Sequence, residues 1–209
     1  MEAKLLLIPW MAAVIYSSVP LFWFPIHPFA ARWRRMKRSP YRALLPLWAV
    51  LIAAIASLTW PWHRVQIYST LWGWVPAAFF FGAGFKTYAR VFSEFGGHKL
   101  SGEVELRPGE HDQQLVTTGL HASMRHPIYF AHLCNMAGWS LASGLTINFV
   151  LLAVSALITF PLMIAMEERE LEKRFGQSFR EYRNRVPAIL ILPSKGRRLE
   201  QTHRTEAPE

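Results

Sequence analysis

Long stretches without charged residues alternate with short, densely charged segments along the chain. The uncharged blocks cover residues 5–31, 43–62, 65–85 and 127–166, the last being 40 residues long. A helix of that length measures about 60 Å, twice the roughly 30 Å of a bilayer's hydrocarbon core, so this block has to cross twice. The pattern predicts an all-α membrane protein with about five transmembrane helices and a cytoplasmic C-terminal helical segment.

The long block should break near residues 143–148, where small and polar side chains cluster. The second of the two resulting helices should run on into a charged stretch and end at Gly176. A short helix is expected near residues 179–185, with Pro187 as its stop. The first block is too long for the apolar core of a signal peptide, which predicts a retained span.

The charged residues predict the orientation of the spans. Six basic residues and no acidic one lie within residues 32–42, so this loop is expected on the cytoplasmic side. Alternation then places the N-terminus outside and the active site on the cytoplasmic face. The predicted parts are three N-terminal helices (1–85), a cytoplasmic connecting segment (86–126), a C-terminal helix pair with its following segment (127–193) and a disordered tail (194–209).

Composition narrows the possible functions. The net charge is +9, but the excess lies mostly in one short loop, which membrane topology explains better than nucleic-acid binding. The single cysteine, Cys134, allows no intrachain disulfide. The histidines match no common zinc spacing, and no metal is expected. Membrane lipids are the expected surroundings.

Two polar groups flank the last pair of predicted spans on the cytoplasmic side. Arg125 and His126 stand directly before the fourth span, and Glu167 and Glu168 directly after the fifth. Taken alone, the first pair is better explained by interfacial anchoring, and a solvated helix end explains Glu170 and Glu172. A carboxylate at the depth of Glu167, however, needs a cation, which Arg125, His126 or a ligand's ammonium group could supply.

These residues, in this order, resemble the isoprenylcysteine carboxyl methyltransferase family and its relatives, including the phospholipid N-methyltransferases. The resemblance covers about residues 85–193. The residues that carry it are Leu115-Val116-Thr117-Thr118-Gly119, Arg125-His126-Pro127-Ile128-Tyr129, Glu167-Glu168, Phe175-Gly176, Glu181-Tyr182 and Arg185-Val186-Pro187.

The resemblance implies an S-adenosylmethionine site between the last two spans and the C-terminal segment. Glu167 would hold the methionine amino group, and Arg125 and Glu167 are the expected catalytic residues. A lipophilic small-molecule or lipid-linked acceptor would enter sideways from the membrane. The expected cofactor-binding residues are Gln113, Gln114, Leu115, Val116, His121, His126, Pro127, Ile128, Tyr129 and Glu167.

The chain departs from the family pattern at three positions. Gln113 stands where the family usually has His, and His121 where it usually has an aromatic residue. Met163 replaces an Arg that contacts the substrate carboxylate in prenylcysteine enzymes, so a different acceptor is expected. Met163, Phe160 and Trp139 could form its walls or simply pack helices, and His132 could face the site or contact a neighbouring helix.

Two other readings stay open at this point. Some sterol-reductase-like membrane enzymes share an Arg-His-Pro-type motif, and Arg183, Arg185 or Lys195 could then meet the 2′-phosphate of NADPH. The chain is short for such a reductase. In a non-catalytic membrane protein, Arg125 and Glu167 would form only an ion pair between helices.

Overall fold

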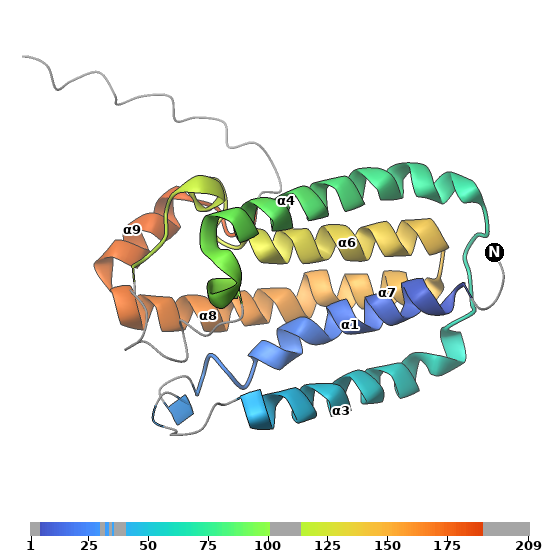
Figure 1. Ribbon diagram of the computed structural model, residues 1–209, viewed down its shortest axis with the longest axis horizontal. Coiled ribbons are helices and arrows are strands. Elements are labelled where there is room, and N and C mark those ends of the chain that lie inside the picture. Colours follow the sequence, from blue (N-terminus) through green and yellow to red (C-terminus); the bar gives the residue numbers. More distant parts are fainter. Residues whose placement is uncertain (1–4, 30–31, 34, 36–40, 101–113, 190–209) are drawn as a thin grey trace, which may run out of the picture.

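A computed structural model describes residues 5–29, 32–33, 35, 41–100 and 114–189, without the side chains of residues 95–100. The described chain is a bundle of helices, and its only strand pairing is one bridge between Gln66 and Leu145. The all-α prediction is therefore confirmed for this part of the chain (Figure 1). The elements are α1 (Leu7–Trp23), α3 (Tyr41–Thr59), the turns η1 (Trp60–Trp62) and η2 (Leu71–Gly73), α4 (Trp74–Leu100), the turn η3 (Gly119–Ala122), α6 (Pro127–Ser143), α7 (Thr146–Val154), the π-turn η4 (Ser155–Thr159), α8 (Phe160–Phe175) and α9 (Gln177–Arg185).

Two helical stretches, Tyr41–Trp62 and Thr146–Phe175, are long and apolar enough to cross a membrane. The second consists of α7, η4 and α8, which follow one another without a break. Pro161 explains the π-turn between them: it has no N–H to donate, and the Phe160 N–H bonds to the Ser155 carbonyl five residues back.

The turn between α6 and α7 forms inside the predicted segment 143–148. Gly144 ends α6 with φ of 65°, in the left-handed region. The extended segment after η1 is fastened to this turn, because the Ile67 N–H donates to the Gly144 carbonyl (2.8 Å) and the Thr146 N–H to the Val65 carbonyl (2.9 Å). The turn thereby joins the last helix pair to the rest of the bundle.

Three helix boundaries differ from the ends of the uncharged blocks. The uncharged block 65–85 does not form one helix, because its first residues bond to the α6–α7 turn, and α4 begins only at Trp74. Lys86 and Arg90 do not end α4, since both are good helix formers, and it continues to Leu100. Helix α1 ends at Trp23, well short of residue 31, because Pro25 has no N–H with which to continue the helical hydrogen bonds.

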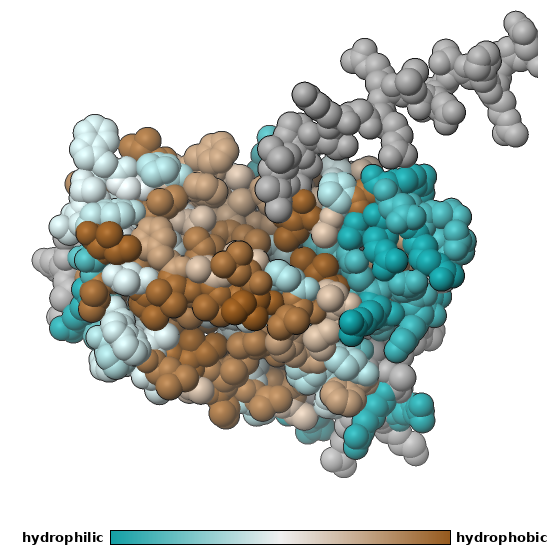
Figure 2. Space-filling view, turned by 180° about the vertical axis from the view of Figure 1, so that it is seen from behind, coloured by the Kyte–Doolittle hydropathy of each residue, from teal (hydrophilic) through white to brown (hydrophobic). Residues whose placement is uncertain are grey.

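The two ends of the bundle differ in character. Helix α9, the C-terminal half of α8 and the segment leading from α1 toward α3 lie at one end (Figure 1). Figure 2 shows hydrophobic residues over the middle of one face and hydrophilic residues gathered at that same end. On α3, Leu45, Leu47 and Val50 are 50–66% exposed, as a lipid-facing helix requires.

Replacing Gly144 by Ala should destabilise the bundle. Its φ costs a side-chain-bearing residue about 1–2 kcal/mol, and an added Cβ would lie 2.2 Å from the Tyr68 carbonyl oxygen. Gly82 on α4 is the matched control, because a Cβ there meets nothing within 4 Å. In unfolding titrations in detergent, Gly144→Ala should lower the free energy of unfolding by at least about 1 kcal/mol, and Gly82→Ala should not lower it. Equal effects of the two changes would contradict the described turn.

Candidate active site

A buried carboxylate on α8 lies against the start of α6. One oxygen of Glu167, Oε2, accepts a hydrogen bond from the Tyr129 hydroxyl (2.6 Å) and lies 3.4 Å from His126 Nδ1. The side chains of His126 and Glu167 are only 3% and 16% exposed. The two groups on either side of the last helix pair, which the sequence singled out, are therefore in direct contact.

The local sequence explains this contact. Pro127 occupies the first turn of α6, where its missing N–H costs nothing, and His126 is the residue that precedes the helix. Tyr129 follows three residues later, so its side chain lies on the same face as that of His126. Their rings stack with centroids 5.3 Å apart and an interplanar angle of 9°. Imidazole and phenol thus reach α8 together.

The neighbouring carboxylate, Glu168, has a different set of partners. Its Oε1 accepts from Arg125 Nε (2.8 Å) and Nη2 (2.6 Å) and lies 3.0 Å from His126 Nε2. The remaining guanidinium nitrogen of Arg125, Nη1, donates to the carbonyls of Arg183 and Val186 at the end of α9. Every one of these contacts is to the protein, which favours a positioning role for Arg125, and its catalytic role stays a prediction.

The segment that contains α9 and the residues after it packs against the start of α6, at the corner formed by His126 and Glu167. The Arg125 N–H donates to the Pro187 carbonyl and the His126 N–H to the Ala188 carbonyl, both at 2.9 Å. The Tyr182 hydroxyl donates to the His121 carbonyl at 2.6 Å. The segment after α9 therefore lies beside the start of α6, where the family resemblance implied it.

The two charges stabilise each other. Burial alone would lower the pKa of His126, but the adjacent Glu167 and Glu168 outweigh it and raise the pKa to about 9. Burial alone would raise the pKa of Glu167, but the nearby His126 and the Tyr129 hydroxyl hold it below its usual range. At neutral pH the pair is therefore an imidazolium facing a carboxylate.

One oxygen of Glu167 is left for a ligand. Both protein contacts of its carboxylate use Oε2, and Oε1 has no partner among the residues that the structure describes. The side chain is only 16% exposed, but Oε1 is not sealed from solvent, so a cationic or hydrogen-bond-donating ligand could reach and stabilise this oxygen. The chemistry of this group fits an ammonium ion.

The structure gives less information on the other predicted cofactor-binding residues. Gln114 is exposed, and Leu115 and Val116 are partly buried in a coil before η3, so their contact with a cofactor stays a prediction. Gln113 and the tail from residue 194 lie outside the described residues. His121 is close enough to Glu167 for charge interaction, although burial, the larger effect, lowers the pKa of His121.

A second carboxylate contact on α8 was not predicted. Glu170 was expected at a solvated helix end, but it is only 9% exposed. It does pair with Arg174 (3.6 Å), as helix spacing suggests, and its other oxygen lies 3.6 Å from His27 Nδ1. The three-residue spacing from Glu167 could have shown that the two share a face of α8. This contact ties the segment after α1 to the site.

The three possible wall residues do not lie together. Phe160 and Met163 are fully buried in one cluster with Tyr129. Trp139 instead packs on Phe81 and lines an apolar cavity of about 250 Å³ with Leu5, Ile8, Pro9, Trp74, Ala142 and Ser143. It is about 18 Å along α6 from Pro127, because twelve residues rise 1.5 Å each. Trp139 therefore lies apart from the Phe160–Met163 cluster, and its contact with an acceptor stays a prediction.

Comparison with known proteins agrees with this geometry. Residues 102–178 match the family model described as phospholipid methyltransferase. This segment is similar to that family. It contains α6, α7 and α8, with both halves of the His126–Glu167 contact, so the similarity covers the site. No solved structure matches the chain significantly.

Similar curated proteins confirm the relationship to the isoprenylcysteine methyltransferases. Protein-S-isoprenylcysteine O-methyltransferase B of Arabidopsis thaliana is 33% identical over 44% of this chain and 46% of its own length. The nickel-cobalt-cadmium resistance protein NccN of Alcaligenes xylosoxydans xylosoxydans is 34% identical over 39% of the chain and 38% of its own. Methanethiol S-methyltransferase 1 of Bradyrhizobium diazoefficiens is 31% identical over 47% of the chain and 33% of its own. The chain thus matches less than half of each relative, and none of these supports a reductase.

The His126–Glu167 pair predicts a particular pH dependence of stability. Because the pKa of His126 is raised, this residue stabilises the folded state fully below its ordinary pKa of 6.5, and that stabilisation is lost as pH rises through about 9. Because the pKa of Glu167 is lowered, this residue stabilises the folded state above its ordinary pKa of 4.5, and that stabilisation is lost in acid. The free energy of unfolding of the wild type should therefore exceed that of His126→Asn by on the order of 2–3 kcal/mol between about pH 5 and 6.5, and by much less at pH 9.5. Unfolding titrations in detergent measure this, and a difference that does not change with pH would contradict the pair.

Proposed function

We propose that the protein is an integral membrane methyltransferase that uses S-adenosylmethionine and acts on a lipophilic acceptor other than a prenylcysteine carboxylate. The observation that carries this proposal is the buried carboxylate of Glu167, oriented by His126 and Tyr129 with one oxygen open. The methyltransferase family of residues 102–178 supports it independently.

The residues at the corner have complementary tasks in this proposal. Glu167 Oε1 receives the amino group of the methyl donor, an interaction strengthened by exclusion of water. His126 and Tyr129 hold Glu167 Oε2 and so fix the direction of the free oxygen. Arg125 orients Glu168 and fastens α9 over the site. When bound, the cofactor supplies a methyl group already activated on a sulfonium, so the protein chiefly aligns the reactants.

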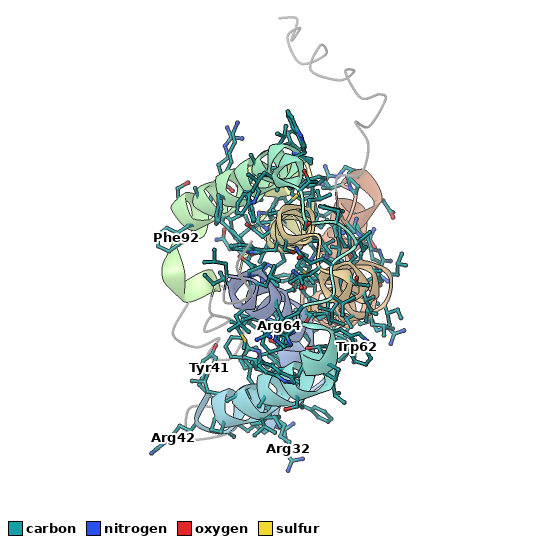
Figure 3. All side chains as sticks on the ribbon, turned by 90° about the vertical axis from the view of Figure 1, so that its right-hand side faces the viewer. Arg32, Tyr41, Arg42, Trp62, Arg64 and Phe92 are labelled. Carbon is teal, nitrogen blue, oxygen red and sulfur yellow. The ribbon has the colours of Figure 1, made fainter. Side chains whose placement is uncertain are left out.

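The proposed topology has five spans, with the site in the cytoplasm and the N-terminus outside. The five crossings are α1, α3, α4, α6 and the stretch from α7 into α8. Arg32 and Arg42 extend outward from the part of the chain that lies at the α9 end, whereas Arg64 lies in the loop at the opposite end (Figures 1 and 3). Positive charge at the α9 end supports a cytoplasmic site.

The acceptor is proposed from what the site lacks and from its surroundings. Met163 lies one helical turn before Glu167, is fully buried, and supplies no cation for a carboxylate. The similarity to a methanethiol S-methyltransferase favours a neutral, apolar acceptor instead. Such a molecule is soluble in the bilayer and would approach α8 from the membrane side.

Glu167→Gln should weaken binding of S-adenosylhomocysteine by about 10- to 100-fold, because a charge-assisted hydrogen bond is lost. Glu181→Gln is the matched control, since Glu181 is exposed and, within the described part of the chain, its carboxylate contacts only Gln177. Calorimetry of the detergent-purified protein measures both. Tighter binding of NADPH than of S-adenosylhomocysteine, or equal binding by Glu167→Gln and wild type, would overturn the proposal.

A further inference from the structure

A second polar group lies one helical turn further along α6, inside the apolar part of the bundle. His132 Nδ1 is 2.7 Å from the Tyr88 hydroxyl of α4 and 2.9 Å from the Ile128 carbonyl oxygen of its own helix. Tyr16 of α1 packs edge-on against the imidazole, with ring centroids 5.3 Å apart. Three helices therefore hold this ring in one orientation.

The contacts of Nδ1 favour one position for the hydrogen on the ring. A carbonyl oxygen can only accept, so the 2.9 Å contact with Ile128 favours the hydrogen on Nδ1, and the Tyr88 hydroxyl oxygen, 2.7 Å away, is then a second acceptor of that hydrogen. A neutral imidazole then has a lone pair on Nε2. This nitrogen makes no hydrogen bond with any residue that the structure describes, and it is not sealed off. His132 thus presents an open base on a fixed scaffold.

The position of His132 connects it to the candidate site. Phe160 lies against both Tyr129 (5.4 Å between ring centroids) and His132 (6.1 Å). Tyr129 in turn holds Glu167. His132 is therefore on the membrane side of the Glu167 corner, where a lipophilic acceptor would arrive.

Two other histidines near the site, His126 and His27, already face carboxylates. Both ring nitrogens of His126 lie against carboxylates, Nδ1 against Glu167 and Nε2 against Glu168. His27 is paired with Glu170. Within the described residues, no acidic side chain contacts His132, so no ion pair holds its resting ring in the charged form.

We propose that His132 Nε2 removes the proton of the methyl acceptor, and that the acceptor is a lipophilic molecule with an ionisable X–H group, a thiol, hydroxyl or amine. This inference rests on the proposed function. The X–H bond breaks and its proton goes to Nε2. The X–C bond forms as the donor's S–C bond breaks, and that electron pair stays on the sulfonium sulfur. A carboxylate acceptor, already ionised at neutral pH, would not need such a base.

The first test is independent of turnover. ¹⁵N NMR of histidine-labelled protein in detergent, with the His132 signals assigned by comparison with His132→Asn, reports the tautomer directly. The proposal predicts a neutral ring with hydrogen on Nδ1 and none on Nε2 at pH 7. A signal showing hydrogen on Nε2, or a charged ring, would overturn it.

The second test separates base catalysis from structure. His132→Asn keeps a donor near the Ile128 carbonyl but loses Nε2. It should slow methylation of octanethiol by about 10²- to 10⁴-fold while changing the rate for 4-butylthiophenol, assayed where it is already ionised, by less than about threefold. His63→Asn, the same change at the opposite end of the bundle, should affect neither rate.

Every outcome of this assay decides something. Loss of both rates by His132→Asn, with binding of S-adenosylhomocysteine intact, would show a structural role and overturn the proposal. Wild type that methylates octanoate but not octanethiol, octanol or octylamine, or methylates none of them, would overturn the assigned acceptor class. Wild type that binds no S-adenosylhomocysteine would instead overturn the proposed function itself.

Discussion

The ion pair between His126 and Glu167 is the interaction on which the functional end of the bundle depends. Burying either charge alone costs several kcal/mol, and each is tolerated because the other lies 3.4 Å away. The start of α6 at His126 and the part of α8 around Glu167 therefore have to lie side by side. The turn at Gly144, which joins α6 to α7, makes this antiparallel register possible.

The two adjacent carboxylates, Glu167 and Glu168, make different contacts. Glu168 is held by Arg125 and His126 and, through Arg125, binds the end of α9. Glu167 is held on one side only, by Tyr129 and His126, and keeps its other oxygen free. Successive residues of a helix point in different directions, so one side chain serves the fold and the other can serve a ligand.

Much of this could be predicted from the sequence, because uncharged length and the bilayer's thickness together limit the helices. The helix pair of residues 127–166 followed from that argument, and Gly176 and Pro187 indicated the end of α8 and the extent of α9. The start of α4 could not be predicted, since the bonds of the preceding segment to the α6–α7 turn join residues far apart in sequence. The same holds for the burial of Glu170, which contacts His27 in the segment after α1.

The account places a carboxylate for the donor at the end of the bundle and an open imidazole further into its apolar part. Its central claim is that Glu167 holds the donor's amino group. An experimental structure of the protein with S-adenosylhomocysteine tests this most directly. The account predicts the ligand's amino nitrogen within hydrogen-bonding distance of Glu167 Oε1, with Oε2 still on Tyr129. A ligand bound elsewhere, or one that turns its carboxylate toward Glu167, would contradict it.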